Sequence, residues 1–542
     1  MSSKGTRSGS AAVDDRVFLA WDYPVFALLT ILNAAVFGYA LFYWFVSRGP
    51  SAHPVLFGLL SIPLVMTIAA YEIRWLTLPF MSRPRAVPAR EGWKVGVATT
   101  FVPGAEPIEM LETTLRAMVA MDYPHETWVL DEGDNEEVKA LCRRLKVGHF
   151  TRKGVSRYQT QGGQFGRRTK PGNYNAWFEE VGFSRYELIV AFDPDHVPRK
   201  EFLCEVLGYF DDPGVGFVQA PQVYYNQPAS FIALGAAQET YAYYSSIQMT
   251  SYALGYPIVT GCHTAHRASA LKEVGGFAPH DADDLLITIL YRVAGWRGIY
   301  VPKKLAVGLV PVDWRGYITQ QRRWARSVLD VKFRVYPQLA GRLPSLERVT
   351  GFLHGLYYLH GLGTALTVLV LAYLLGTGIA PRVVSPATFL CLLLVAGVIQ
   401  ICDLYRQRFF IDRATEAGWH WRVAVLRFAK WPYIFQALND VIFPRIRPYE
   451  ITMKVKTQTG RFVLARSHLF VAGLLSMCWI VGSALGRIDN PVLHVIAALW
   501  VLASIGVVLT ELLTFPEPFD LELCERATRA STDLDLSAGV RL

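Results

Sequence analysis

The sequence has few charged residues and no cysteine spacing of a familiar metal-binding type. Asp, Glu, Lys and Arg together make up 18% of its 542 residues, whereas hydrophobic residues make up 52%. This balance is typical of a membrane protein that also carries a soluble part. None of the seven cysteines forms a CxxC pair, so their spacing suggests neither a zinc site nor a disulfide framework.

The chain also lacks a nucleic-acid-binding motif, although it is basic, with a formal net charge of +9 at pH 7. A basic excess without such a motif argues against a nucleic-acid partner. It fits better with the anionic inner leaflet of a lipid bilayer and with a polyanionic substrate such as a nucleotide sugar.

Six apolar stretches approach or exceed the about 20 residues that a spanning helix needs. Basic residues gather in the segments after the second and fourth stretches, so the positive-inside rule places both termini and the large soluble segment in the cytoplasm. No A-x-A-like cleavage site accompanies the first stretch, which is expected to be a retained anchor in the inner (plasma) membrane. The stretches are 23–46, 54–80, 351–376, 385–403, 465–485 and 491–514.

The segment between the second and third stretches has the pattern of an α/β domain. Strands are predicted at 95–102, 127–130, 187–192 and 214–225, with a helix at 107–121. Strands alternating with helices predict a mostly parallel sheet. The whole chain then divides into a disordered N-terminus (1–20), two transmembrane helices (21–90), the cytoplasmic domain (91–313), an interfacial helix (314–348), two more spans (349–403), a cytoplasmic interfacial stretch (404–464), two last spans (465–515) and a cytoplasmic tail (516–542).

Carboxylates follow two of the predicted strands. Asp193 and Asp195 stand in FDPDHVP after a buried strand, where two hard oxygen ligands can hold a divalent cation, although Asp-Pro-Asp is also good turn chemistry. Asp131 ends the strand before it and could accept a hydrogen bond from a base or ribose, or could cap a helix over 135–145. Ligands of such sheets bind at the carboxyl ends of the strands, so these carboxylates are expected to converge.

Two further sites in the domain have a functional and a structural interpretation. Lys170 precedes a Gly-Asn turn and a helix start, where it could meet a phosphate or simply be solvated. Asp283 and Asp284 open a predicted helix, which suits the helix dipole. One of these two carboxylates could instead be a general base that takes a proton from a hydroxyl.

The QQRRW sequence that ends at Trp324 lies in a predicted amphipathic helix. Spacings of three and four place Gln320, Arg323 and Trp324 on one face. Arg323 offers a fork of donors for a pyrophosphate, and Trp324 offers a flat apolar surface for a sugar ring. A membrane-surface helix with snorkelling arginines is the alternative, but it requires no particular glutamine.

Together these residues resemble the processive family 2 glycosyltransferases of the cellulose synthase type, which includes bacterial cellulose, curdlan and hyaluronan synthases. That family shows a series D, DxD, ED and QxxRW, and a gating loop FxVTxK that is similar to YEITMK at 449–454. The matching residues are Asp131, Asp193 with Asp195, Asp283 with Asp284, and Gln320 to Trp324.

The resemblance implies a glycosyltransferase-A type α/β domain inserted between the transmembrane helices. It implies an inverting enzyme that polymerises a β-linked polysaccharide, most simply a β-glucan, from a UDP-sugar and moves the growing polysaccharide through the bilayer, with accessory export proteins as further partners. The implied roles are Asp284 as catalytic base; Asp131, Lys170, Asp193, Gln320 and Arg323 for the nucleotide sugar; Asp193 and Asp195 for Mg²⁺ or Mn²⁺; Trp324, Cys262 and His263 at the acceptor; and Tyr449, Thr452 and Lys454 in the gating loop.

The sequence departs from the family's pattern in ways that leave sugar, linkage and activator open. The third motif is Ala282-Asp283-Asp284, without the usual Thr-Glu, and Cys262 and His263 replace part of an FFCGS element. The stretch after the last span is too short for a c-di-GMP-binding domain. A synthase of an N-acetylhexosamine or mannose polymer, a non-processive transferase that adds one sugar to a lipid carrier, and a non-catalytic scaffold or transporter are the alternatives.

Overall fold

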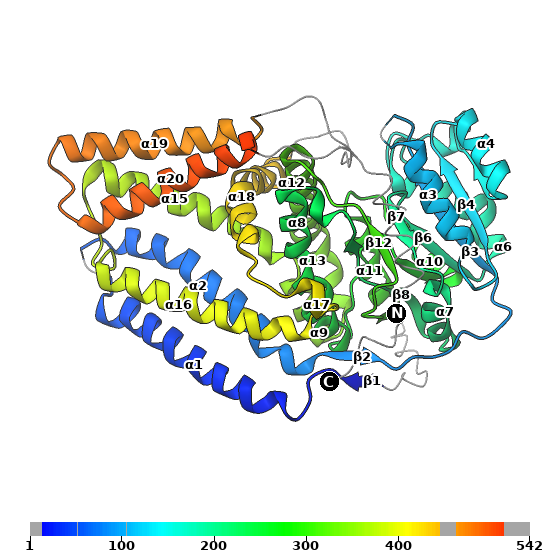
Figure 1. Ribbon diagram of the computed structural model, residues 1–542, viewed down its shortest axis with the longest axis horizontal. Coiled ribbons are helices and arrows are strands. Elements are labelled where there is room, and N and C mark those ends of the chain that lie inside the picture. Colours follow the sequence, from blue (N-terminus) through cyan, green and yellow to red (C-terminus); the bar gives the residue numbers. More distant parts are fainter. Residues whose placement is uncertain (1–13, 51, 105, 445–461, 514–542) are drawn as a thin grey trace.

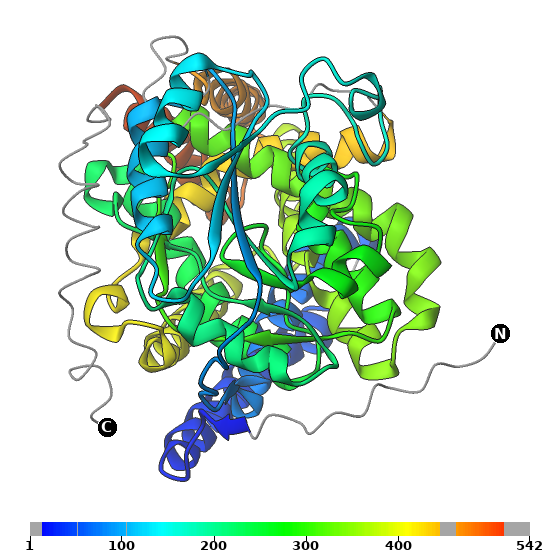
Figure 2. The same ribbon diagram turned by 90° about the vertical axis from the view of Figure 1, so that its right-hand side faces the viewer.

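The computed structural model describes residues 14–50, 52–104, 106–444 and 462–513. Long helices form one end of the molecule and an α/β domain forms the other, with α8 (Phe231–Ala242), α12 (Trp314–Asp330) and α18 (Trp421–Ile442) between them (Figure 1). Seen from the α/β end, the membrane helices lie behind the sheet (Figure 2).

Within the described ranges, six helical segments are long and apolar enough to span a membrane, as the sequence predicts. Large apolar side chains such as Leu28, Ile480 and Leu502 stay exposed along them, which is expected of a surface that faces lipid. The segments are Asp22–Ser47 (with α1, Asp22–Phe42), Pro54–Phe80 (α2, Pro54–Leu76), Ser345–Thr377 (α14, Ser345–Leu353, and α15, His360–Thr377), Pro386–Phe409 (α16, Pro386–Arg406), Ala465–Ala484 (α19) and Pro491–Leu512 (within α20, Pro491–Leu513).

The α/β domain is built on a seven-stranded sheet in the order β11-β8-β10-β6-β3-β4-β5. All neighbours are parallel except β10, which runs antiparallel to both β6 and β8. The central strands β3 and β6 are buried along their whole length, because helices cover both faces of the sheet. The strands are β3 (Val95–Phe101), β4 (Glu126–Asp131), β5 (Gly148–Phe150), β6 (Leu188–Phe192), β8 (Val215–Gln219), β10 (Thr264–Arg267) and β11 (Arg297–Tyr300).

The single strand predicted over 214–225 is wrong, because the structure divides it between two sheets. Its first part is β8 in the large sheet, and its second part, β9 (Val223–Tyr224), joins a three-stranded sheet with β7 (His196–Pro198) and β12 (Ala306–Gly308). Pro221 lies at the break, and a proline has no N–H to continue the ladder.

The predicted disorder of residues 1–20 does not hold for residues 14–20, while residues 1–13 lie outside the described part. Strand β1 (Asp14–Arg16) pairs with β2 (Ser82–Pro84), and Tyr252 donates a hydrogen bond of 2.7 Å to Asp14. The Phe18 side chain is buried against the core. The backbone pairing of β1 and the buried Phe18 ring hold residues 14–20 in place. The polar composition of this stretch does not reveal either contact.

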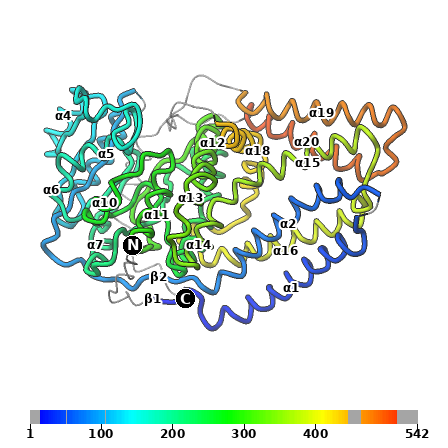
Figure 3. The backbone as a smooth tube through the Cα atoms, turned by 180° about the vertical axis from the view of Figure 1, so that it is seen from behind, coloured from blue at the N-terminus to red at the C-terminus, as the bar shows by residue number. Residues whose placement is uncertain are grey.

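Helix α12 packs on α18, and buried charges join them to α8. Lys430 of α18 donates to both carboxylate oxygens of Glu239 at 2.9 Å and to Gln321 at 2.8 Å, while Arg322 pairs with Asp440 at 3.1 Å. The predicted membrane-surface placement of the two helices stays a prediction. Beyond α12 the chain turns through α13 (Tyr336–Leu339) and α14, which lie between the α/β domain and α2 and α16 (Figure 3).

Removing Lys430 is therefore expected to destabilise the protein. Lys430→Met leaves the Glu239 carboxylate buried without its cation, which costs about 3–5 kcal/mol of unfolding free energy. Lys303→Met, which breaks a more exposed pair with Glu205, is the matched control and is expected to cost at most about 1 kcal/mol. Thermal unfolding of the detergent-solubilised variants measures both, and equal losses would contradict the role given to Lys430.

Candidate active site

The turn that follows β6 presents the two carboxylates of FDPDHVP. The turn interpretation of this motif is confirmed, because the His196 amide donates to the Asp193 carbonyl at 3.1 Å and the Thr114 hydroxyl donates to the Pro194 carbonyl at 2.7 Å. The cation-binding interpretation stays a prediction. Asp193 is half-buried and Asp195 is buried. The carboxylates are thus held by β6 and by α3 (Ile108–Val119).

Lys170 lies against these carboxylates and not in open solvent. It begins α5 (Lys170–Trp177), whose first turn is capped by Thr169, and its ammonium group pairs with Asp193 and donates to the Gly261 carbonyl at 2.8 Å. Burial lowers the pKa of Lys170, but the nearby Asp193 outweighs burial and holds this pKa well above its usual value. Lys170 therefore stays protonated, and its positive charge is held next to the Asp193 carboxylate.

Asp283 and Asp284 lie on the other side of Gly261, at the start of α11 (Asp283–Val293). Asp284 accepts a hydrogen bond of 2.7 Å from the Leu285 amide, and a Cβ atom on Gly261 would lie only 3.5 Å from its other carboxylate oxygen. Burial raises the pKa of both carboxyl groups, and the neighbouring Asp284 charge adds to this and raises the pKa of Asp283 to about 7. Carboxyl groups with raised pKa values are well suited to accept a proton near neutral pH.

Of the five residues of the QQRRW sequence in α12, Arg322 alone lies outside the cavity wall, because Gln321 lines it as well as contacting α18. Gln320, Arg323 and Trp324 line the same cavity as Asp284, and the Arg323 charge lowers the pKa of that carboxyl against the effect of burial. The intervening residues Gln321 and Arg322 make the contacts with α18 described above. The helical spacing predicted from the sequence is confirmed.

One cavity of about 1960 Å³ connects these residues with the membrane helices. It begins at Lys170 and Asp193, passes Asp284 and Trp324, and continues along α2, α16 and α18. Residues of these three helices in its wall include Met66, Ile73 and Arg74, then Ile399 and Asp403, and Arg427 and Lys430. The ionisable side chains of the α/β domain and the spanning helices thus line one common cavity.

Charged residues of the membrane helices in this wall were missed in the sequence. Arg74 lies in the second span and Asp403 in the fourth, and both face the cavity. The sequence could have revealed both residues, because an ionisable residue inside an apolar span is a functional candidate by default.

Asp131 lies at the same sheet edge, but its carboxylate faces away from the cavity. It is fully buried and accepts hydrogen bonds from the amides of Gly133 and Asn135, and His149 lies 3.2 Å from it. Its neighbours Glu132 and Gly133 line the cavity instead. These contacts fit the helix-start interpretation, with Asn135 itself as the cap of α4 (Glu136–Leu145).

Cys262 and His263 do not line the place predicted for an acceptor. Both side chains are fully buried, whereas Thr260 and Gly261 form the cavity wall. Gly261 and His263 adopt left-handed φ values of 78° and 57°, and this pair of turns directs the two side chains beneath the wall. The predicted gating-loop residues Tyr449, Thr452 and Lys454 lie outside the described residues.

Residues 97–327 match the protein family described as "Glycosyltransferase like family 2". Over 308 residues, 55% of this chain, the sequence is 23% identical to a cellulose synthase catalytic subunit (UDP-forming) of Xanthomonas axonopodis pv. citri (strain 306), and over 297 residues, 53% of the chain, it is 25% identical to cellulose synthase 2 of Novacetimonas hansenii. The matched stretches cover 40% and 17% of those two relatives, so the chain spans less than half of their length.

Among solved structures, the fold is similar to that of the mannosyltransferase PcManGT from Pyrobaculum calidifontis in complex with GDP-Man and Mn²⁺. That likeness has a TM-score of 0.48 at 16% identity and covers 78% of this chain and 100% of the other. A glucosyl-3-phosphoglycerate synthase from Mycobacterium tuberculosis, in complex with Mn²⁺, UDP and glucosyl-3-phosphoglycerate, gives 0.28 at 13% identity over 39% and 70% of the two chains.

The buried position of Cys262 predicts that it resists thiol reagents. In the folded protein, maleimide is expected to label the exposed Cys204 within minutes and to leave Cys262 unlabelled until denaturant is added. Peptide mapping by mass spectrometry measures both sites in one sample. Labelling of Cys262 in the native protein at a rate similar to that of Cys204 would indicate that the Cys262 side chain lines the cavity.

Proposed function

We propose that this protein, which carries a family 2 glycosyltransferase domain at residues 97–327, polymerises a β-linked polysaccharide from a UDP-sugar and passes the growing chain across the membrane. The observation that carries the proposal is the single cavity that runs from the acidic side chains to the spanning helices. The names of the relatives make UDP-glucose the first donor to test, with a β-glucan as the product.

The donor is proposed to bind at Lys170, Asp193, Gln320 and Arg323. Asp193 and Asp195 fit Mg²⁺ or Mn²⁺, because they offer hard carboxylate oxygens and because the ammonium group on Asp193 marks a position that favours positive charge. When bound there, such a cation supplies positive charge against the diphosphate of the leaving nucleotide. Lys170 and Arg323 add fixed charge on the same side, which lowers the cost of charge that builds on the leaving group.

Asp284 is proposed as the base that takes the proton from the acceptor hydroxyl. Attack by that oxygen on the anomeric carbon, from the face opposite the nucleotide, converts an α-linked donor into a β-linkage. Trp324 lies on the same cavity wall and offers a flat apolar face for the acceptor sugar. Asp283 raises the proton affinity of the pair by like-charge repulsion.

Passage of the product follows from the same cavity. A glycan is too polar to cross hydrocarbon unaided, so a protein-lined path is needed. The cavity wall changes from the α/β domain to α2, α16 and α18 without a break, which fits secretion of the chain as it grows. The positive-inside pattern supports a catalytic domain on the cytoplasmic side of the inner membrane. Export partners and the predicted gating loop are further parts of the proposal.

The direct test offers purified protein in detergent a panel of radiolabelled UDP- and GDP-sugars. A polymer that grows from one UDP-sugar and is degraded by a β-specific hydrolase is expected. Asp284→Asn is expected to lower its formation by about 10²- to 10⁴-fold, while UDP affinity, measured by calorimetry, stays within about threefold. Products of a single added sugar on a lipid would contradict polymerisation, and near-normal turnover by Asp284→Asn would contradict the base.

The pH profile gives a second test, because the base acts only when it is deprotonated. Since burial raises the folded pKa of Asp284, activity is expected to fall at a higher pH than the usual carboxyl range around 4. Asp283→Asn removes a like charge and is expected to move this acid limb down by about one pH unit. Asp281→Asn, which neutralises the exposed partner of Arg326, is the control and leaves the limb in place.

A further inference from the structure

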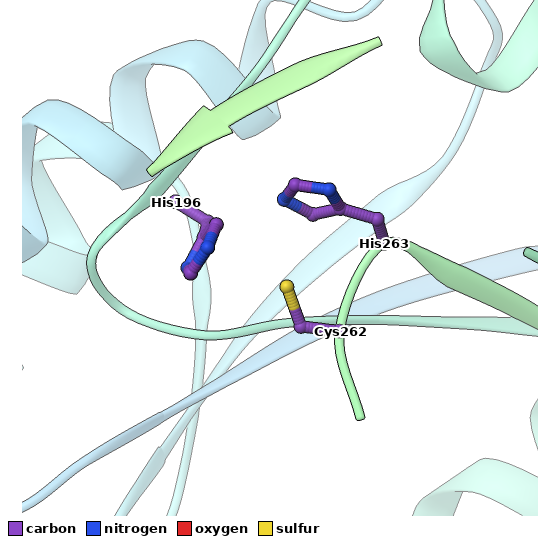
Figure 4. A group of neighbouring side chains, drawn as sticks. All are labelled: His196, Cys262 and His263. Carbon is purple, nitrogen blue, oxygen red and sulfur yellow. The ribbon is translucent and has the colours of Figure 1, made fainter. Parts of the chain in front are cut away.

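Three side chains that are able to bind a metal point toward one another beneath the candidate donor site. They are His196 at the start of β7, and Cys262 and His263 in the turn before β10 (Figure 4). All three are buried, with exposed fractions of 2%, 0% and 0%, and their ligand atoms lie within 4.8 Å of one another. Two imidazoles and a thiol are the ligand types of zinc sites, although the sequence spacing gives no sign of one.

The hydrogen bonds of the two rings leave one nitrogen of each unsatisfied. Nδ1 of His196 lies 3.2 Å from an Asp195 carboxylate oxygen, and Nδ1 of His263 lies 2.9 Å from the Pro221 carbonyl oxygen. Nε2 of both rings is buried without a hydrogen-bond partner. An imidazole that ligates a metal usually has this arrangement, in which a carboxylate or carbonyl holds one nitrogen and the other meets the ion.

We propose that His196, Cys262 and His263 bind one transition-metal ion of the zinc type, at a site that adjoins the Asp193 and Asp195 carboxylates of the donor site, which lie close to His196 as well. Thiolate and imidazole ligands favour such an ion over Mg²⁺, whereas carboxylates favour Mg²⁺ or Mn²⁺. An ion central to three atoms separated by at most 4.8 Å lies within about 2.8 Å of each, so movements of about 0.5–0.8 Å at most bring them to zinc distances.

The ion binds Cys262 as the thiolate and both imidazoles in their neutral form. The thiol proton of Cys262, and any proton on a ligating ring nitrogen, therefore leaves to solvent when the ion binds.

The site would fix the geometry of the donor carboxylates. Asp195 contacts the His196 ring, and Gly261, whose carbonyl accepts from Lys170, directly precedes Cys262. An ion held by His196 and Cys262 thus joins the turn after β6 to the turn before β10. The three ligands are positioning residues, because they lie beneath the cavity wall and support the residues that line it.

The test titrates the full-length protein in detergent, after metal removal with a chelator, with Co²⁺ as the probe. One equivalent of Co²⁺ is expected to give a thiolate-to-cobalt charge-transfer band in the near ultraviolet, which carboxylates cannot produce. Excess Mg²⁺ is expected to leave the band unchanged. Cys262→Ser is expected to abolish it and His263→Gln to weaken Co²⁺ binding at least tenfold, whereas the exposed-site control Cys204→Ser keeps the band.

Elemental analysis of protein purified without chelator is the second measurement, and it does not depend on a variant that folds. About one zinc per chain is expected, with a ratio near zero in Cys262→Ser. Unmodified protein that contains no zinc and shows no thiolate band with Co²⁺ would overturn the proposal, as would a band that persists in Cys262→Ser. Neither outcome depends on glycan synthesis, so this proposal can fail while the proposed function stands.

Discussion

The ammonium group of Lys170 is the contact on which the rest of the site depends. It joins three separate pieces of chain: the start of α5, the Asp193 carboxylate after β6, and the Gly261 carbonyl before β10. Gly261 in turn lies against Asp284 at the start of α11. In the low dielectric of a buried site such an ion pair is strong, and its neutralisation of Asp193 allows several carboxylates to lie close together.

Much of this arrangement could be predicted from the sequence, because strong local patterns set it. The six spanning helices follow from length and hydropathy, the central strand from the run Leu188–Phe192, and the cavity-facing side of α12 from spacings of three and four. The predicted positions that the structure does not support belong to side chains whose direction is set by the local backbone. Two positive φ values turn Cys262 and His263 under the wall, and the turn after β4 draws the Asp131 carboxylate inward; neither effect leaves a trace in residue order.

The same limit explains why residue order does not reveal the cluster of His196, Cys262 and His263. Metal sites are recognised in sequences by ligands at short, regular intervals, and here His196 is far along the chain from the other two. The sheet brings them together, because Thr264 of β10 pairs with Ala191 of β6. Long-range pairing of this kind lies outside any local spacing rule.

The reversed direction of β10 has a consequence for how the candidate site can diversify. In a sheet whose strands all run one way, only the loops that leave the strands reach the binding edge. Because β10 runs the other way, the loop that enters it arrives at that edge as well, beside the exits of β3 and β6. Changes at 259–261 can therefore reshape the cavity wall while β6, which carries Asp193, keeps its register. Under the proposed function, the preferences for acceptor and donor could then evolve separately.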